Sequence, residues 1–192
     1  MISKIINISQ NQDNLNQILL ETQKASLNAT LDNKQTLRAR LIAEEFVGML
    51  KELSTDFRGE FWIEAENHDF SFIAQIHVNE VMDLQTKRRF IEVSSSKKNT
   101  TKGIIGKIRD IVENLLYPEN AMYSSSFVAY QLETAVLLNN QWTLSKYKDA
   151  ERDNAEPWDE LEKSIIANLA DDVIVSVKGS NVEIVITKDF DK

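Results

Sequence analysis

The chain has 192 residues, of which 42% are hydrophobic and 27% are charged. This composition is ordinary for a globular protein with one substantial core and excludes a disordered chain. The formal net charge of −8 argues against nonspecific binding to nucleic acid or to an anionic membrane, because phosphate contacts need a net basic face. The lack of cysteine excludes disulfides, thiolate nucleophiles and zinc–thiolate sites, and it fits a reducing compartment.

The first residues read as a short strand candidate and not as a signal peptide. Isoleucines at positions 2, 5, 6 and 8 form an apolar run that Asn7 and Ser9 interrupt. No apolar stretch of the sequence approaches the roughly 20 residues needed to cross a bilayer. We therefore expect a cytoplasmic protein.

Two helices are predicted next. Asp13 or Asn14 is placed to cap the first helix. The second is predicted over about Lys34–Leu53, because apolar residues recur there at helical spacing. This apolar stripe consists of Ile42, Phe46, Met49 and Leu53.

Two stretches alternate apolar and polar residues about a short turn, which is the pattern of an antiparallel hairpin with one buried face. The first runs from Phe61 to Val78 around a polar turn at 67–69. The second runs from Val173 to Thr187 around Gly179 and Ser180. We expect both hairpins to contribute strands to one sheet.

Between the hairpins we expect a short basic helix, a polar loop, a helix over Gly103–Leu116 and an insertion at about 118–171. Within the insertion, Pro157 is expected to open a helix that continues through Ile165 and Leu169. The element order predicts a single α+β domain over 1–192. Its expected form is a two-layer sandwich, with helices on one face of a mixed, mostly antiparallel sheet.

This order resembles the ATPase fold shared by gyrase, sensor histidine kinases and anti-sigma-factor kinases, known as the Bergerat or GHKL fold. The resemblance covers most of residues 1–116 and the final hairpin. The segment TLRARLIAEEFVGMLKEL looks like the helix with the family's N-box, and KGIIGKIRDIVENL looks like the glycine motif after the ATP lid. The segments AEE, FWIE, SSSKKN and GKIRD also resemble an uncharacterised bacterial family.

In the GHKL family a glutamate of the N-box activates water, and an asparagine one turn later binds magnesium. The resemblance therefore implies Glu44 or Glu45 as the general base, but the asparagine position is Gly48, which offers magnesium no side-chain oxygen. The favoured alternative is that one glutamate is solvated and that the other pairs with a nearby arginine.

The family's D-x-G-x-G motif, which reads the adenine amino group, is missing after the first hairpin. The strand runs into residues 78–83 without a glycine, so that Asn79 or Asp83 would have to take the place of the family's aspartate. These departures weaken the case for magnesium-dependent hydrolysis of ATP.

A lysine-bearing loop leads into the Gly103–Leu116 helix. Lys102, Gly103, Gly106 and Lys107 could hold a phosphate there, because the free N–H groups and the positive dipole end of a helix start favour anions. The alternative is a solvated loop, with glycines that allow close helix packing. Residues 94–102 lack apolar anchors, so we expect them to be among the most mobile.

Other conspicuous side chains have simpler interpretations. His68 and His77 lack a second ligand at metal spacing, so no metal site is expected. Trp62 lies on the outward side of its strand, where either the insertion covers it or it belongs to a partner surface. We expect the insertion to cover it. Trp142 and Trp158 are expected to be packing anchors.

The sequence thus predicts a cytoplasmic regulatory protein with a GHKL-like fold that acts by binding a protein partner, its nucleotide binding reduced or lost. The resemblance implies partners in sigma-factor regulation: a sigma factor, an anti-sigma antagonist or a phosphatase. No cofactor, nucleic acid or membrane is expected as a ligand. One alternative is an active serine kinase or ATPase that uses ATP and magnesium. The other is a homo-oligomeric scaffold or homodimer.

Overall fold

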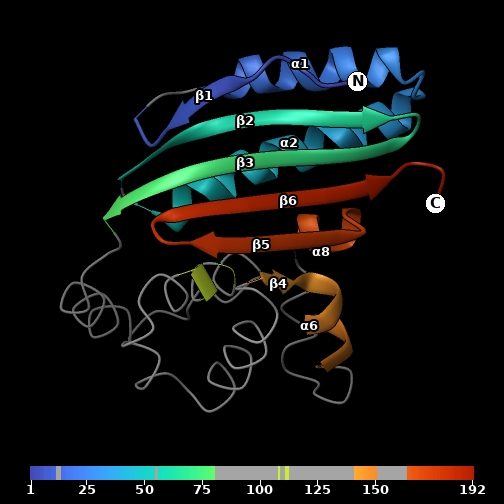
Figure 1. Cartoon of the computed structure of the whole chain (residues 1–192). Helices are drawn as coiled ribbons and strands as arrows, with labels where there is room; N and C mark the ends of the chain where they lie inside the picture. The colour runs from blue at the N-terminus through green and yellow to red at the C-terminus, as the bar shows by residue number, and fades with distance from the viewer. Residues whose placement is uncertain (12–13, 55, 81–107, 109–110, 113–140, 151–163) are drawn as a thin grey trace, which may run out of the picture.

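The structure, a computed structural model, describes all residues except 12–13, 55, 81–107, 109–110, 113–140 and 151–163. Its strands form one sheet in the order β1-β2-β3-β6-β5-β4 (Figure 1). The described strands are β1 Ile6–Ser9, β2 Asp56–Glu66, β3 Asp69–Glu80, β4 Gln141–Thr143, β5 Asp172–Lys178 and β6 Asn181–Asp189. The described helices are α1 Leu15–Asn28, α2 Asn33–Leu53, α6 Leu144–Ala150 and α8 Ile165–Leu169.

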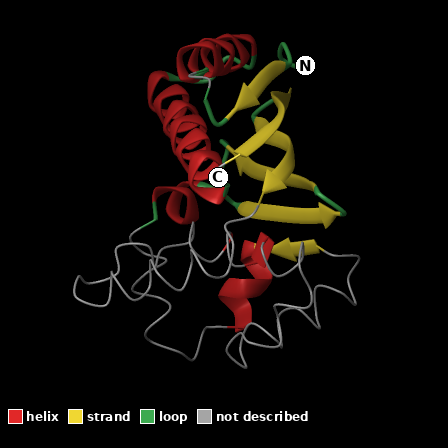
Figure 2. Cartoon of the chain, turned by 90° about the vertical axis from the view of Figure 1, so that its left-hand side faces the viewer, coloured by secondary structure: helices red, strands yellow, loops and turns green. Residues whose placement is uncertain are grey.

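The helices α1, α2 and α8 lie on one side of the sheet (Figure 2). The predicted α+β class is therefore confirmed. The expectation of a mixed sheet is wrong for the described strands, because every pairing among them is antiparallel. The physical reason is that both hairpins reverse the chain, and that the helix pair α1–α2 returns it beside β1 in the opposite direction.

A capping box fixes the start of α2, and an apolar stripe fixes its orientation. Asp32 accepts a hydrogen bond from the Gln35 backbone N–H at 2.7 Å, and the Gln35 side chain accepts one from the Asp32 N–H at 2.8 Å. Phe46 meets Phe61 of β2 edge to face, with ring centroids 5.7 Å apart. The predicted stripe is buried at all four positions, Ile42, Phe46, Met49 and Leu53.

The strand β3 lies in the middle of the sheet and joins the two predicted hairpins. It pairs with β2 along its whole length and with β6 from Asp69 to His77. Gly179 takes the first position of the two-residue turn between β5 and β6, where its φ of +58° suits glycine. The prediction that both hairpins share one sheet is confirmed.

Three residues of the helix predicted over Gly103–Leu116 are described. Ile108, Ile111 and Val112 are helical, and all three are buried in the same core as the sheet and α2. Their spacing places them on one side of a helix, as the sequence predicted. The rest of that predicted helix lies outside the described residues.

The insertion is only partly as expected. The backbone of Ser164 is extended, and its side chain accepts a hydrogen bond from the Ala167 N–H, so a helix begins at Ile165. The prediction of one continuous helix from Pro157 through Ile165 is therefore wrong, because Ser164 interrupts it. The sequence also did not predict β4 and α6. Trp142 of β4 is buried against Tyr147, which confirms it as a packing anchor.

A buried carboxylate ties α1 to the residues before β1. The Glu21 side chain accepts hydrogen bonds from the Lys24 ammonium at 2.7 Å and from the Lys4 backbone N–H at 3.5 Å. The hydrogen bond from Lys24 lowers the pKa of Glu21. Asn14 occupies the predicted N-cap position of α1, but its side chain donates to the Asn7 carbonyl and does not cap the helix.

Two glycines should respond oppositely to alanine. A Cβ at Gly59 would lie 2.1 Å from the Gln75 carbonyl oxygen, whereas a Cβ at Gly48 would meet no atom of the described residues within 4 Å. We expect Gly59→Ala to lower the free energy of unfolding by roughly 1–3 kcal/mol through overpacking. Gly48→Ala should raise it by about 0.5–1 kcal/mol, because glycine inside a helix costs backbone entropy. Urea denaturation measures both, and equal shifts would contradict this packing.

Candidate functional site

The N-box candidates lie in the second half of α2. Glu44 and Gly48 are exposed, and Glu45 is half-buried. Since a general base is tuned by burial and by neighbouring groups, an exposed Glu44 is poorly placed for that task. The described residues leave open space around Gly48, so their packing does not impose its lack of a side chain.

Of the other residues of the predicted nucleotide site, the structure describes only Asn79. Asn79 is the penultimate residue of β3, which ends at the side of the sheet where α2 also ends (Figure 1). Asn79 and the C-terminal half of α2 are thus brought to the same end of the molecule. Asp83, Lys102, Gly103, Gly106 and Lys107 lie outside the described residues, as does the loop 94–102.

The two histidines have separate partners. His68 Nδ1 lies 2.5 Å from a carboxylate oxygen of Asp191, and His77 Nδ1 lies 3.0 Å from the side-chain oxygen of Asn181. Within the described part of the chain, no three metal-ligating side chains gather in one place. None of the described helices is long and apolar enough to span a bilayer.

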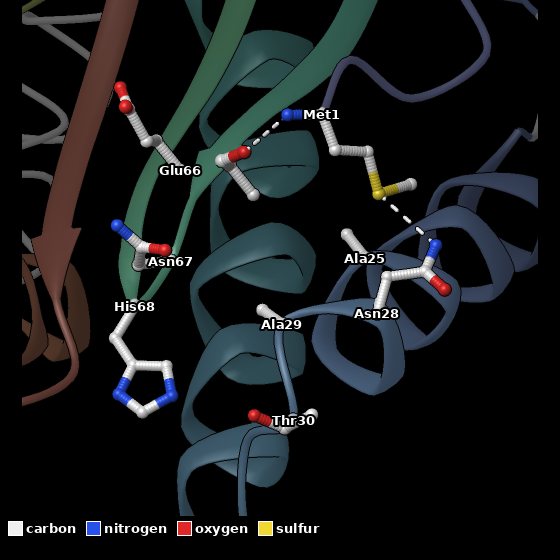
Figure 3. Close-up of a pocket in the computed structure, with 9 residues that line it drawn as sticks. Met1, Ala25, Asn28, Ala29, Thr30, Glu66, Asn67 and His68 are labelled. Atoms are coloured by element: carbon white, nitrogen blue, oxygen red, sulfur yellow. Dashed lines mark hydrogen bonds between the residues drawn. The ribbon is translucent and has the colours of Figure 1, made fainter.

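A pocket of about 440 Å³ lies between the end of α1 and the β2–β3 turn (Figure 3). The Met1 amino group donates to the Ala65 carbonyl at 2.5 Å, and the Asn28 amide contacts the Met1 sulfur. Glu66 and His68 point away from Met1 and Asn28 in Figure 3, so the charged side chains do not converge on the pocket. Its lining is Met1, Ala25, Asn28, Ala29, Thr30, Ala65, Glu66, Asn67 and His68.

A more extended feature lies on the face of the sheet opposite α1, α2 and α8, which we call the outer face. Apolar residues of neighbouring strands stand opposite one another there and form one row across the sheet. Ile5, one residue before β1, is 53% exposed; the register shifts by one residue between the Ile6–Phe61 pair and the Ile2–Glu64 bridge, so Lys4 and Ile5 both stand opposite Trp62. Ile73, in the middle, is buried, and Trp62, Val185 and Ile174 are half-buried. This apolar row consists of Ile5, Trp62, Ile73, Val185 and Ile174.

Polar residues border the apolar row on both sides. One bordering row consists of Glu60, Gln75, Glu183 and Ser176. The other consists of Glu64, Ser71, Thr187 and Asp172. Together these two rows, here called the acidic rows, hold four carboxylates and neither lysine nor arginine. The Trp62 indole N–H donates to Glu64 at 2.9 Å, and the Gln75 amide donates to Glu183 at 2.6 Å.

The expectation that the insertion covers Trp62 gains no support from the described residues. In the sheet order, β4 stands four strands away from β2, a separation of about 19 Å at the usual strand spacing. The helix α6 contacts β4 and β5, and α8 packs against α2 on the helical side. The described parts of the insertion thus lie away from Trp62, and residues 118–140 and 151–163 are outside the described set.

Comparison of the sequence with protein-family models and with curated proteins finds no match. The resemblance to the GHKL family therefore remains a prediction.

The His68–Asp191 contact predicts a measurable pH dependence. The hydrogen bond to Asp191 raises the pKa of His68 above its ordinary value of 6.5. A raised pKa stabilises the fold fully below about pH 6.5, and this contribution disappears as the pH rises through the folded value. Asp191→Asn should therefore lower the pKa of His68. It should lower the free energy of unfolding mainly below about pH 6.5, where His68 is protonated in both the folded and the unfolded chain.

NMR titration of the imidazole measures this pKa. A His77→Gln background leaves His68 as the single histidine, because the chain has two. The same His68 pKa with and without Asp191→Asn would show that the contact does not persist in solution.

Proposed function

We propose that this chain is a cytoplasmic regulatory protein that acts by binding a protein partner, and that its GHKL-type fold has reduced or lost nucleotide binding. The observation that carries the proposal is the apolar row on the outer face. Contiguous apolar surface with a polar border is typical of protein interaction sites. The half-buried Trp62 is the kind of large aromatic residue that dominates binding energy at such sites.

The element order supports the GHKL part of the proposal. A strand and two helices precede the first long hairpin, and the final hairpin adds to the sheet through the pairing of β6 with β3. The segment that resembles the N-box helix is α2, and its apolar side packs on the sheet through Phe46. The resemblance makes a regulator of a sigma-factor pathway the partner class that we propose.

The residues of α2 support reduced nucleotide binding. Magnesium prefers oxygen ligands, and Gly48 supplies none at the N-box asparagine position. Glu44 is exposed, and the residues after β3 lack the glycines that let a backbone approach a nucleotide. An active ATP-dependent kinase or ATPase would need each of these functions from other residues.

We predict no measurable ATP hydrolysis and weak or absent ATP binding by the full chain. Calorimetry with magnesium and ATP measures the affinity, and phosphate release measures the reaction. Gly48→Asn restores the missing side-chain oxygen at a position with free space, and we expect it not to restore hydrolysis, because the D-x-G-x-G motif is still missing.

Low-micromolar ATP affinity in the unmodified chain would contradict the proposal and favour the enzyme alternative. In that case Glu44→Gln and Glu45→Gln identify the base, since only the residue that activates water should abolish turnover while ATP still binds.

A further inference from the structure

We infer that the partner binds across the outer face of the sheet and that the bound segment is an amphipathic helix with lysine or arginine on both borders of its apolar stripe. This inference rests on the proposed function. It adds the place of binding and the chemistry of the partner.

The size of the apolar row sets the length of the bound segment. The row crosses five neighbouring strand positions, which is four strand spacings or about 19 Å. At 1.5 Å per residue, an α-helix of this length has about 13 residues, or between three and four turns. A single helix laid across the strands therefore matches the row from Ile5 to Ile174.

The acidic rows set the charge of the segment. They lie two residues along each strand from the apolar row, about 7 Å away. A helix about 10–12 Å in diameter, centred on the row, places its flanking side chains over both acidic rows. Glu60 and Glu183 lie under one flank, and Glu64 and Asp172 lie under the other. Lysine or arginine on both flanks would complement these carboxylates.

The cations of this face lie outside the acidic rows. Arg58 on β2 and Lys178 on β5 stand one row beyond Glu60 and Glu183, and Lys4 stands beside Ile5 at the β1 end of the apolar row. The row beyond Glu64 holds the carboxylates of Glu66, Asp69 and Asp189, of which Asp189 is paired with Lys192 at 3.1 Å. The Asp172 carboxylate also accepts hydrogen bonds from Ser145, so the other three carboxylates are the stronger contact points.

The charge pattern disfavours other occupants. A symmetric dimer joined through this face would place two sets of acidic rows against each other, because such an interface uses the same surface twice. Nucleic acid or an anionic lipid surface would bring phosphates against the same carboxylates. A basic protein segment is the occupant that this face complements.

The test uses a 16-residue helical peptide of leucine and lysine, with one apolar stripe bordered by lysine on both sides, labelled with fluorescein. Fluorescence anisotropy measures its Kd for the full chain, and a peptide with glutamate in place of lysine is the charge control. We expect the lysine peptide to bind, with a Kd that rises with salt, and the glutamate peptide not to bind.

Matched substitutions locate the binding site. Glu60→Lys on the outer face and Glu52→Lys on α2 change the net charge equally, and both residues are exposed. Glu60→Lys should weaken peptide binding by about tenfold or more, and Glu52→Lys by less than about twofold. In the same way, Trp62→Ser should weaken binding by more than about tenfold, whereas Leu27→Ser on α1 should not change it.

Several results would overturn the inference. These are failure of the lysine peptide to bind, equal effects of Glu60→Lys and Glu52→Lys, and equal effects of Trp62→Ser and Leu27→Ser. If Trp62→Ser fails to fold, the comparison of Glu60→Lys with Glu52→Lys still tests the binding site, because exposed charges contribute little to folding.

A cross-linking experiment separates this inference from the proposed function. A photoreactive residue replaces Thr187 on the outer face or Leu20 on α1 in cells that make the chain. A cross-link from Thr187 to a basic amphipathic segment of another protein, mapped by mass spectrometry, supports the inference. A partner cross-linked from Leu20 alone overturns the site and leaves the proposed function standing. A Thr187 cross-link to a second copy overturns the inference, and no cross-link from either position contradicts the proposed function.

Discussion

The fold depends on the pairing of β3 with β6, because this ladder joins the two ends of the chain into one sheet. Gln75 and Glu183, which are 108 positions apart, stand side by side in it. The same register places Phe72 opposite Ile186 in the core and Ile73 opposite Val185 on the outer face. A slip by one residue would exchange the two faces, so the core and the candidate partner surface are set by one constraint.

One side of the helix α2 packs on the sheet, and the other side is exposed. Its capping box and apolar stripe fix it on the sheet, while the side with Glu44 and Gly48 faces solvent. A helical glycine in open space is not required by the fold, since a larger residue would fit there. Packing among the described residues therefore gives no reason for a glycine at position 48.

The sequence predicted the elements that depend on local patterns. Helical spacing identified α2, and alternation identified both hairpins, because each signal is contained within one segment. Pairing between distant strands is not written in any one segment, so the antiparallel order and the short β4 were missed. The apolar row was missed for the same reason. In the sequence, Trp62 stands out as a large apolar residue on the polar side of its strand. Ile73, Val185 and Ile174 each look like an isolated break in the alternation, and only the strand register shows that they lie side by side.

The acidic rows bear both on self-association and on the charge of a bound partner. An apolar row across a sheet invites association between copies, and a sheet with long free edges invites further strand pairing. Here the edge strands β1 and β4 have only four and three residues. Two copies placed face to face would bring the carboxylates on both sides of the row against each other, and the net charge of −8 would add to this repulsion. The same carboxylates would attract the basic segment that we propose as the partner, so one set of charges would both limit self-association and select that partner.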